Sequence, residues 1–217
     1  VEDVDLQEDG VVVVHARPRA GERGRCGRCG RRSPGYDRGE GRRRWRALDP
    51  GTIRAYLEAE APRVRCARHG VVVARVPWAR HGAWHTRDFE DQAAWLATQA
   101  PKSAITRLLR DSWRGVGGII TRVVADRRAR VADPLDGLRR IGIDEISYRR
   151  GQRDIMGVVC HDSGDTHRLS NARMEAANAT SAITRRAFGF HSARALIALA
   201  MLTLGGLCPP LPGRALT

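Results

Sequence analysis

The sequence predicts an α+β protein made of several small domains. Short valine-rich segments surround spaced cysteines in the first third of the chain. Apolar residues then recur at helical spacing through the middle third, and a strand–turn–strand pattern opens the last third. With about 100–200 residues per domain, 217 residues suffice for one ordinary domain or two to three small ones, so each pattern can form a unit of its own.

The chain is strongly basic. It carries 38 Lys and Arg against 24 Asp and Glu, a formal net charge of +14, and Lys102 is its sole lysine. Arginine stays ionised and its planar guanidinium matches a phosphate, so the excess predicts attraction to nucleic acid with a strong salt dependence. A solvated basic surface without a partner is the alternative. The longest apolar run, about 13 residues from Ala195 to Leu207, is shorter than the roughly 20 that cross a bilayer, so we expect no membrane partner.

Short strands are predicted on both sides of an arginine-rich segment. The β-branched run Val11 to His15 is the first strand, and alternating or valine-rich stretches at 43–48, 53–59 and 71–76 are the others. Segment 21–46 between them holds ten arginines against three acids. We therefore expect this basic arm to contact phosphates, with Arg28, Arg31 and Arg43 as candidates.

The cysteine spacing predicts a metal site. Cys26 and Cys29 form a Cys-x-x-Cys pair followed by glycine, and Cys66-Ala-Arg-His69 repeats the spacing 36 residues later. Three thiolates and one imidazole can close a tetrahedral structural Zn²⁺ site, and the neighbouring arginines are expected to lower the pKa values of the thiols. The alternative is a pair of unrelated free thiols with a chance Cys-x-x-His. We do not expect a disulfide framework, because the chain has five cysteines at uneven spacing.

Three helices are predicted in the middle of the chain. Residues 88–100 form the first, with Thr86 as its N-cap; 103–109 form the second, after Pro101; and the third runs from Trp113 to about Arg130, capped by Asp111 or Ser112. The tight joint between the last two predicts a helix-turn-helix, whose final helix enters the major groove of DNA. Its outward candidates for DNA contact are Arg114, Thr121 and Arg122. A plain helical bundle is the alternative, and Gly115, Gly117 and Gly118 weaken the front of the third helix.

A buried strand that carries carboxylates is predicted after Pro134. Residues 140–148 form this strand, 154–160 its hairpin partner, and Asp144 and Glu145 lie in the first of the two. Converging carboxylates suit Mg²⁺ chemistry on a phosphodiester, whereas a solvated acid is the alternative. Two further helices are expected at 171–187, with Glu175 near its first turn, and at 193–204, followed by a proline-rich tail.

Three stretches resemble bacterial insertion-sequence transposases of the IS-L-three group. Residues 70–82, GVVVARVPWARHG, are similar to the end of the family's zinc finger. Residues 137–152, GLRRIGIDEISYRRGQ, resemble the first strand of its catalytic domain. Residues 170–178, SNARMEAAN, together with 185–192, RRAFGFHS, resemble its C-terminal helix.

The resemblance implies an RNase H-like catalytic domain with an Asp, Asp, Glu triad that holds Mg²⁺. It assigns the first acid to Asp144 and the third to Glu175, but it supplies no second acid. Only 30 residues lie between the two, and after a hairpin too few remain for a crossover and another strand. We therefore expect a truncated RNase H-like α/β remnant of a hairpin plus C-terminal helices, with an internal deletion between about Asp165 and Ser170.

These observations predict a transposase-family protein that binds double-stranded DNA at the ends of an insertion element and has lost strand cutting. We expect domains at 1–80 (zinc finger), 81–133 (helix-turn-helix) and 134–208 (partial catalytic domain), then a tail at 209–217, in the cytoplasm with the nucleoid. An uncovered apolar helix from Leu196 to Leu204 and an open sheet edge would favour self-association. Two alternatives remain: an active Mg²⁺-dependent enzyme completed by Asp154 or Asp162, and a small zinc-containing regulator or interaction module.

Overall fold

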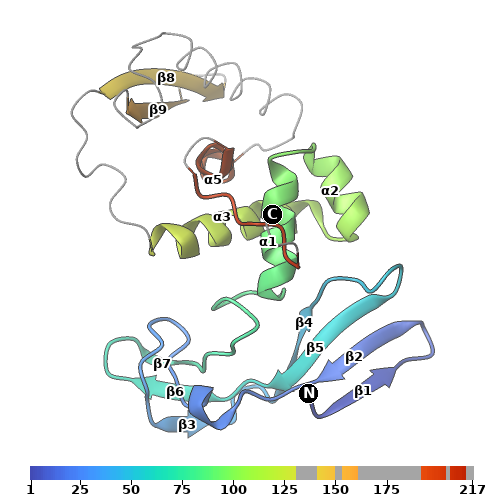
Figure 1. Cartoon of the computed structure of the whole chain (residues 1–217). Helices are drawn as coiled ribbons and strands as arrows, with labels where there is room; N and C mark the ends of the chain where they lie inside the picture. The colour runs from blue at the N-terminus through green and yellow to red at the C-terminus, as the bar shows by residue number, and fades with distance from the viewer. Residues whose placement is uncertain (131–140, 150–152, 161–191, 204–205, 214–217) are drawn as a thin grey trace. The chain divides into compact units, whose positions relative to one another are not determined.

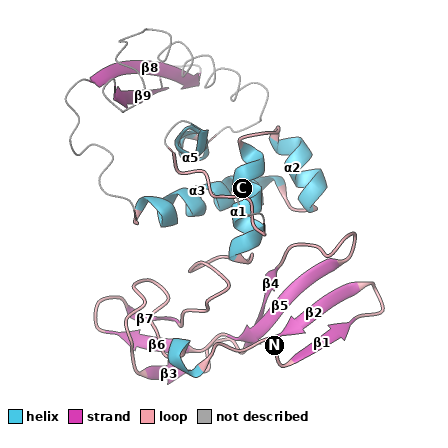
Figure 2. Ribbon diagram, viewed as in Figure 1, coloured by secondary structure: helices cyan, strands magenta, loops and turns pink. Residues whose placement is uncertain are grey.

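The computed structural model describes residues 1–130, 141–149, 153–160, 192–203 and 206–213. These residues belong to two compact units, Val1–Asp91 and Gln92–Thr217. Figure 1 traces the elements of each unit along the chain. Figure 2 shows that the regular elements of the first unit are strands, apart from one short 3-10 helix and the start of a longer helix. Helices prevail among the described residues of the second unit.

A four-stranded sheet begins the first unit. Its strands are β1 (Asp3–Leu6), β2 (Val11–His15), β4 (Arg42–Arg46) and β5 (Arg54–Glu60), in the order β1-β2-β5-β4. β2 and β5 run parallel and the outer pairs are antiparallel. Trp45 of β4 and Ala59 of β5 pack in a buried cluster with Ala61, Val76 and Ala79. The sequence predicted β2, β4 and β5 but not the acidic strand β1, whose four residues are all exposed.

A second, three-stranded sheet contains β3 (Gly35–Asp37), β6 (Arg63–Cys66) and β7 (Gly70–Val73), in the order β3-β6-β7 with antiparallel pairs. A short 3-10 helix, η1 (Ala20–Glu22), precedes the arginine-rich segment. The core under this sheet consists of Cys26, Val64, Cys66 and Val72. Two of the four predicted metal ligands are therefore core residues.

Three helices follow, as the sequence predicted. They are α1 (Arg87–Ala97), α2 (Lys102–Leu109) and α3 (Trp113–Arg128). Thr86 caps α1, since its hydroxyl accepts the backbone N–H of Phe89 at 3.4 Å, and Ser112 caps α3 by accepting the N–H of Gly115 at 3.0 Å. α2 ends where Arg110 takes a left-handed conformation with φ of 51°, which makes the joint before α3 tight. α2 and α3 bury Ile105, Leu109, Val116, Ile119, Ile120 and Val123.

The last described elements are a hairpin and a helix. β8 (Ile141–Arg149) and β9 (Arg153–Cys160) pair antiparallel, with Asp144 opposite Gly157, so the predicted hairpin is confirmed. The helix predicted at 171–187 lies outside the described residues. No helix in the described part of the chain has the length and apolar character needed to cross a bilayer.

The expectation of an uncovered apolar helix is wrong for the residues that the structure describes. α5 (Ala193–Thr203) packs against α3 and buries Leu196, Leu199 and Leu202. The contact is close at Gly117 of α3, where a methyl group would lie 3.8 Å from the Cβ atom of Ala195. This is an ordinary contact distance, so α5 lies against α3 here without requiring a glycine at position 117.

Candidate metal centre and nucleic-acid interface

Four side chains from distant parts of the sequence converge in the first unit. The ligand atoms of Cys26, Cys29, Cys66 and His69 all lie within 4.8 Å of one another. Cys26 and Cys29 flank a tight turn, closed where the N–H of Gly30 bonds to the carbonyl of Cys26 at 2.8 Å. Cys66 ends β6, and His69 lies in the turn just before β7. The structure therefore brings together the four ligands that the sequence predicted.

The spacing of these atoms fits a tetrahedral ion. With bonds of about 2.3 Å to sulfur and about 2.0–2.1 Å to nitrogen, a tetrahedral Zn²⁺ separates two sulfurs by about 3.8 Å and a sulfur from a nitrogen by about 3.6 Å. The sulfurs of Cys29 and Cys66 lie 3.7 Å apart. Nδ1 of His69 lies 3.6 Å from the sulfur of Cys26 and 3.7 Å from that of Cys66. These three separations match a tetrahedral site, and the remaining pairs of ligand atoms lie within 4.8 Å of one another.

The thiols differ in their protonation energetics. Backbone N–H donors, first that of Arg68, lower the pKa of Cys66 to about 6, with His69 contributing. Burial raises the pKa of Cys26. The expectation that neighbouring arginines lower the thiol pKa values is therefore wrong for Cys26, because loss of solvation is the largest effect on this buried sulfur. A bound cation would be needed to hold the sulfur of Cys26 as a thiolate at neutral pH.

The glycine of the Cys-x-x-Cys turn is essential for its geometry. A methyl group at Gly27 would lie 2.5 Å from the carbonyl oxygen of Val73 and 2.6 Å from Nδ1 of His81. The bridge between Cys26 and Ala74 brings the turn against the chain just after β7. Backbone pairing thus holds the Cys26–Cys29 turn against the chain that follows Cys66 and His69.

The basic arm places its three predicted DNA-contact residues differently. Arg31 is exposed, and Arg28 is exposed with its Nε donating to Nε2 of His81 at 3.5 Å. Arg43 is half-buried: it donates to the carbonyl of Ala83 at 2.7 Å, and its guanidinium carbon lies 4.1 Å from the ring centre of Trp84. Burial lowers the pKa of Arg43, which remains far above neutrality in any protein setting.

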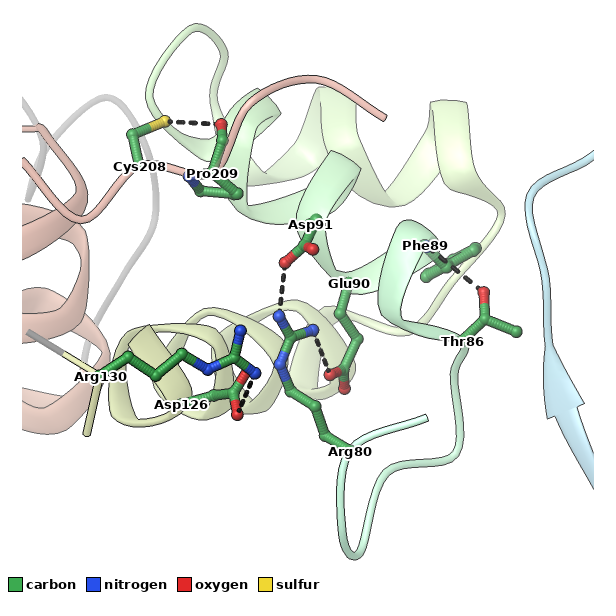
Figure 3. Close-up of polar contacts among 9 residues, drawn as sticks. All are labelled: Arg80, Thr86, Phe89, Glu90, Asp91, Asp126, Arg130, Cys208 and Pro209. Carbon is green, nitrogen blue, oxygen red and sulfur yellow. Dashed lines mark hydrogen bonds and ion pairs between the residues drawn. The ribbon is translucent and has the colours of Figure 1, made fainter. Parts of the chain in front are cut away.

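The segment after the metal centre is firmly fixed. Arg80 is buried and donates to Glu90 at 3.1 Å and to Asp91 at 2.6 Å, as Figure 3 shows. Because Glu90 is fully buried, this pair ties the segment to the first turn of α1. The sequence analysis assigned no side-chain contact to residues 78–86 and missed this clamp, although Arg80 stands ten residues before the paired acids Glu90 and Asp91.

Helix α3 has one buried and one exposed face. Val116, Ile119, Ile120 and Val123 are fully buried, whereas Arg114, Ala125 and Arg128 are exposed. Of the predicted contacts, Arg122 is half-buried, and Thr121 is half-buried with its hydroxyl donating to the carbonyl of Gly117 at 2.9 Å. Sequence reasoning missed Arg128, although helical spacing from Arg114 places it on the same face.

The predicted catalytic acids are not brought together within the described residues. Asp144 lies in the middle of β8, opposite Gly157 of β9. Glu175 lies outside the described residues. An RNase H-like sheet beyond the β8–β9 hairpin is not found in the part of the chain that the structure describes.

Comparison with known proteins gives two family matches. Residues 22–69 match the model described as the zinc-finger of transposase IS204/IS1001/IS1096/IS1165. Residues 74–124 match the model described as the helix-turn-helix domain of transposase family ISL3. The first range contains all four convergent ligands, and the second contains α1, α2 and most of α3.

Two curated relatives are similar to the chain. Each is described as the transposase for insertion sequence element IS1557, one from Mycobacterium tuberculosis strain CDC 1551 / Oshkosh and the other from strain ATCC 25618 / H37Rv. Both are 52% identical over 169 residues, which is 76% of this chain and 38% of the relative. The chain thus aligns with well under half the length of these relatives. No solved structure matches the chain.

Proposed function

Because the chain carries the zinc-finger and helix-turn-helix domains of ISL3-family insertion-sequence transposases, we propose that it binds double-stranded DNA at the ends of such an element. The observation that carries this proposal is the exposed face of α3. Arg114 and Arg128 point away from the buried face, and the chain has a net charge of +14 to attract a polyanion.

The composition of this face suits a DNA groove. Arg114, Gly118, Thr121, Ala125 and Arg128 recur at helical spacing and share one side of α3. Arginines at both ends can contact phosphates or the acceptor edge of guanine, while the small residues between them allow the helix backbone to come close to the bases. Arg122, at the border of this face, adds a third cation.

We propose that the metal centre holds Zn²⁺ in a structural role. Three sulfurs and one imidazole nitrogen form a closed tetrahedral set without a position for substrate, which is typical of structural zinc. The ion would join the Cys26–Cys29 turn to the end of β6 and the turn before β7, and so would fix the arginine-rich segment from which Arg28 and Arg31 extend.

We further propose that this chain does not cut DNA. In an intact relative, Asp144, a second Asp and Glu175 would hold Mg²⁺ around the scissile phosphate. The β8–β9 hairpin uses the chain up to Cys160, which leaves 14 residues before Glu175. A crossover to another strand needs a dozen or more residues before that strand begins, so there is no room for the second acid and its strand.

This proposal keeps the domain bounds expected from the sequence, 1–80, 81–133, 134–208 and 209–217, and a location with the nucleoid in the cytoplasm. We expect weaker self-association than the sequence alone indicated, because α5 packs against α3. Among the described residues β8 and β9 pair with no third strand, and this open edge is the remaining reason to expect self-association.

Salt-dependent binding of the full chain to duplex DNA tests the proposed function. The wild type should bind an element-end duplex more tightly than a scrambled duplex of equal length, with affinity falling steeply as salt rises. The double change Arg114→Gln and Arg128→Gln should flatten the salt slope by about one unit per lost phosphate contact. The double change Arg19→Gln and Arg54→Gln, at two exposed arginines of the first unit, is the control matched for charge.

Two results would contradict the proposal. Equal losses in the α3 double variant and in the Arg19 and Arg54 control would mean that α3 is not the binding face. Zinc uptake without any DNA affinity at physiological salt would favour the alternative of a small zinc-containing interaction module.

A further inference from the structure

Trp84 is an exposed aromatic side chain on a rigid segment. Its side chain has a relative exposure of 65%, although its neighbours Ala83 and Thr86 are buried. The backbone is fixed on both sides, because the N–H of Arg46 bonds to the carbonyl of Trp84 at 2.9 Å and the N–H of Thr86 bonds to the carbonyl of Arg46 at 2.8 Å. The exposure is therefore built into the fold and does not come from a loose loop.

Arg43 supports the indole ring from one side. Its guanidinium carbon lies 4.1 Å from the ring centre of Trp84 and 5.5 Å from that of Trp45. Its Nη2 donates to the carbonyl of Ala83 at 2.7 Å, which fixes the guanidinium beside the ring. Among the described residues Arg43 forms no ion pair, so its positive charge is not neutralised by a contacting carboxylate.

We propose that Trp84 stacks on an unpaired nucleobase of bound DNA. This inference rests on the proposed function, since DNA must be bound for its bases to reach the ring. A flat ring held in place by a cation, with most of its surface open, matches the aromatic platforms on which unpaired bases stack. Stacking on an aromatic ring suits any base, so the contact would recognise single-stranded character rather than sequence.

The chemistry favours a nucleic-acid base over a protein side chain. The surroundings of the ring are basic, with Arg43 against it and Arg28 bonded to His81 three residues before it. A phosphate chain that carries the base would be attracted by these cations, whereas an apolar protein surface would have to cover the guanidinium of Arg43 without a counter-charge.

The test compares two DNA probes with the full chain. One probe is a blunt duplex, and the other is the same duplex with an unpaired overhang of about five nucleotides. The wild type should bind the overhang probe about tenfold more tightly, and the overhang should quench part of the tryptophan fluorescence. Trp84→Leu should remove both the gain in affinity and the quenching while its affinity for the blunt duplex stays the same.

Tyr36→Leu is the matched control. Tyr36 is also exposed, at 46%, and also lies beside guanidinium groups, those of Arg63 and Arg65 at 5.5 and 5.0 Å from its ring centre. The gain from the overhang should survive in this variant. A gain that persists in Trp84→Leu, or that is lost equally in Tyr36→Leu, overturns the inference. A wild type that binds the blunt duplex but gains nothing from the overhang overturns it too and leaves the proposed function standing, whereas a wild type that binds neither probe overturns both.

Discussion

The sulfur of Cys26 lies 3.6 Å from Nδ1 of His69, although the two residues are 43 positions apart in the chain. The contact joins the Cys-x-x-Cys turn to the β6–β7 turn, and the intervening chain forms β3, β4, β5 and β6. Neither turn can bury its ligands alone. The metal centre is therefore expected to fold together with both sheets of the first unit.

Loss of a metal ligand should remove the ion and unfold this region. We expect one equivalent of zinc in the purified wild type and none in Cys26→Ser or Cys66→Ser, because three ligands cannot close the site. Metal analysis and far-ultraviolet circular dichroism measure the two effects. Cys208→Ser is the control, because Cys208 lies outside the cluster and should keep the full equivalent. A metal-free wild type with a folded first unit would refute the site.

Gly27→Ala should disturb the metal centre without removing a ligand. The new methyl group would lie 2.5 Å from the backbone oxygen of Val73, which cannot rotate away. We expect a loss of about 1–3 kcal/mol in the stability of the first unit, together with weaker zinc binding in a chelator competition. Gly35→Ala in β3 is the matched control, since a methyl group there has no atom within 4 Å and should change little.

The three glycines at the start of α3 should respond differently to alanine. At Gly117 a methyl group makes ordinary contacts, 3.6 Å from Nζ of Lys102 and 3.8 Å from Cβ of Ala195, so Gly117→Ala should stabilise α3 by about 0.5–1 kcal/mol. Gly118→Ala, 3.4 Å from Nη1 of Arg122, should behave similarly. At Gly115 a methyl group would lie 2.6 Å from Oδ2 of Asp111 and 3.0 Å from Oγ of Ser112.

Gly115→Ala should therefore be destabilising. The capping bond from Ser112 to the N–H of Gly115 would be strained, and a lost cap costs about 1 kcal/mol, which outweighs the gain in helix propensity. Urea denaturation followed by circular dichroism measures all three variants. Equal stabilisation by alanine at positions 115, 117 and 118 would show that helix propensity alone determines the effect of these substitutions.

Local patterns in the sequence predicted four of the seven strands of the first unit, the helices α1 to α3, the β8–β9 hairpin and the four residues that converge in the Cys/His cluster. A regular spacing of apolar residues marks strand β2, helices α2 and α3 and the β8–β9 hairpin. Residues such as Pro101 and Ser112 mark where elements begin or end. Both signals can be identified from neighbouring positions alone. The strand β1 was missed because its residues are acidic and exposed, and its stability comes from pairing with β2 rather than from its own pattern. The packing of α5 on α3 was also missed, because a contact between Gly117 and Ala195 depends on tertiary structure that periodicity cannot reveal.

Glu58 should make the first sheet sensitive to acid. Its carboxylate accepts the Nε donors of Arg44 at 2.6 Å and Arg42 at 2.7 Å, and these bonds, that of Arg44 first, lower the pKa of Glu58. A lowered pKa stabilises the folded state above the ordinary glutamate value of about 4.3, and this contribution is lost as the pH falls through the lower folded value. Glu58→Gln should lower the free energy of unfolding by about 1–2 kcal/mol at neutral pH. The loss is no larger because both arginines are more than one-third exposed, so water screens their charges.

The cost of Glu58→Gln should shrink as the pH falls below about 4. Denaturation curves of wild type and variant at several pH values give the difference directly. Glu60→Gln, an exposed glutamate on the same strand without an ion pair among the described residues, should show little effect. A difference between wild type and Glu58→Gln that stays constant down to pH 3 would mean that the carboxylate does not act through its charge.

Strand cutting distinguishes the proposed DNA-binding protein without cutting activity from the alternative, an active Mg²⁺-dependent enzyme. If the chain lacks the second acid, supercoiled plasmid should remain intact with Mg²⁺ or Mn²⁺ at protein concentrations that saturate DNA binding. If Asp154 or Asp162 completes the site instead, nicking should occur and should vanish in Asp144→Ala and Glu175→Ala. Asp154 pairs with Ser147 at the turn end of the hairpin, three positions along β8 from Asp144. We expect the plasmid to stay supercoiled, because the 14 residues between Cys160 and Glu175 are too few for a crossover and a further strand that would carry the second acid.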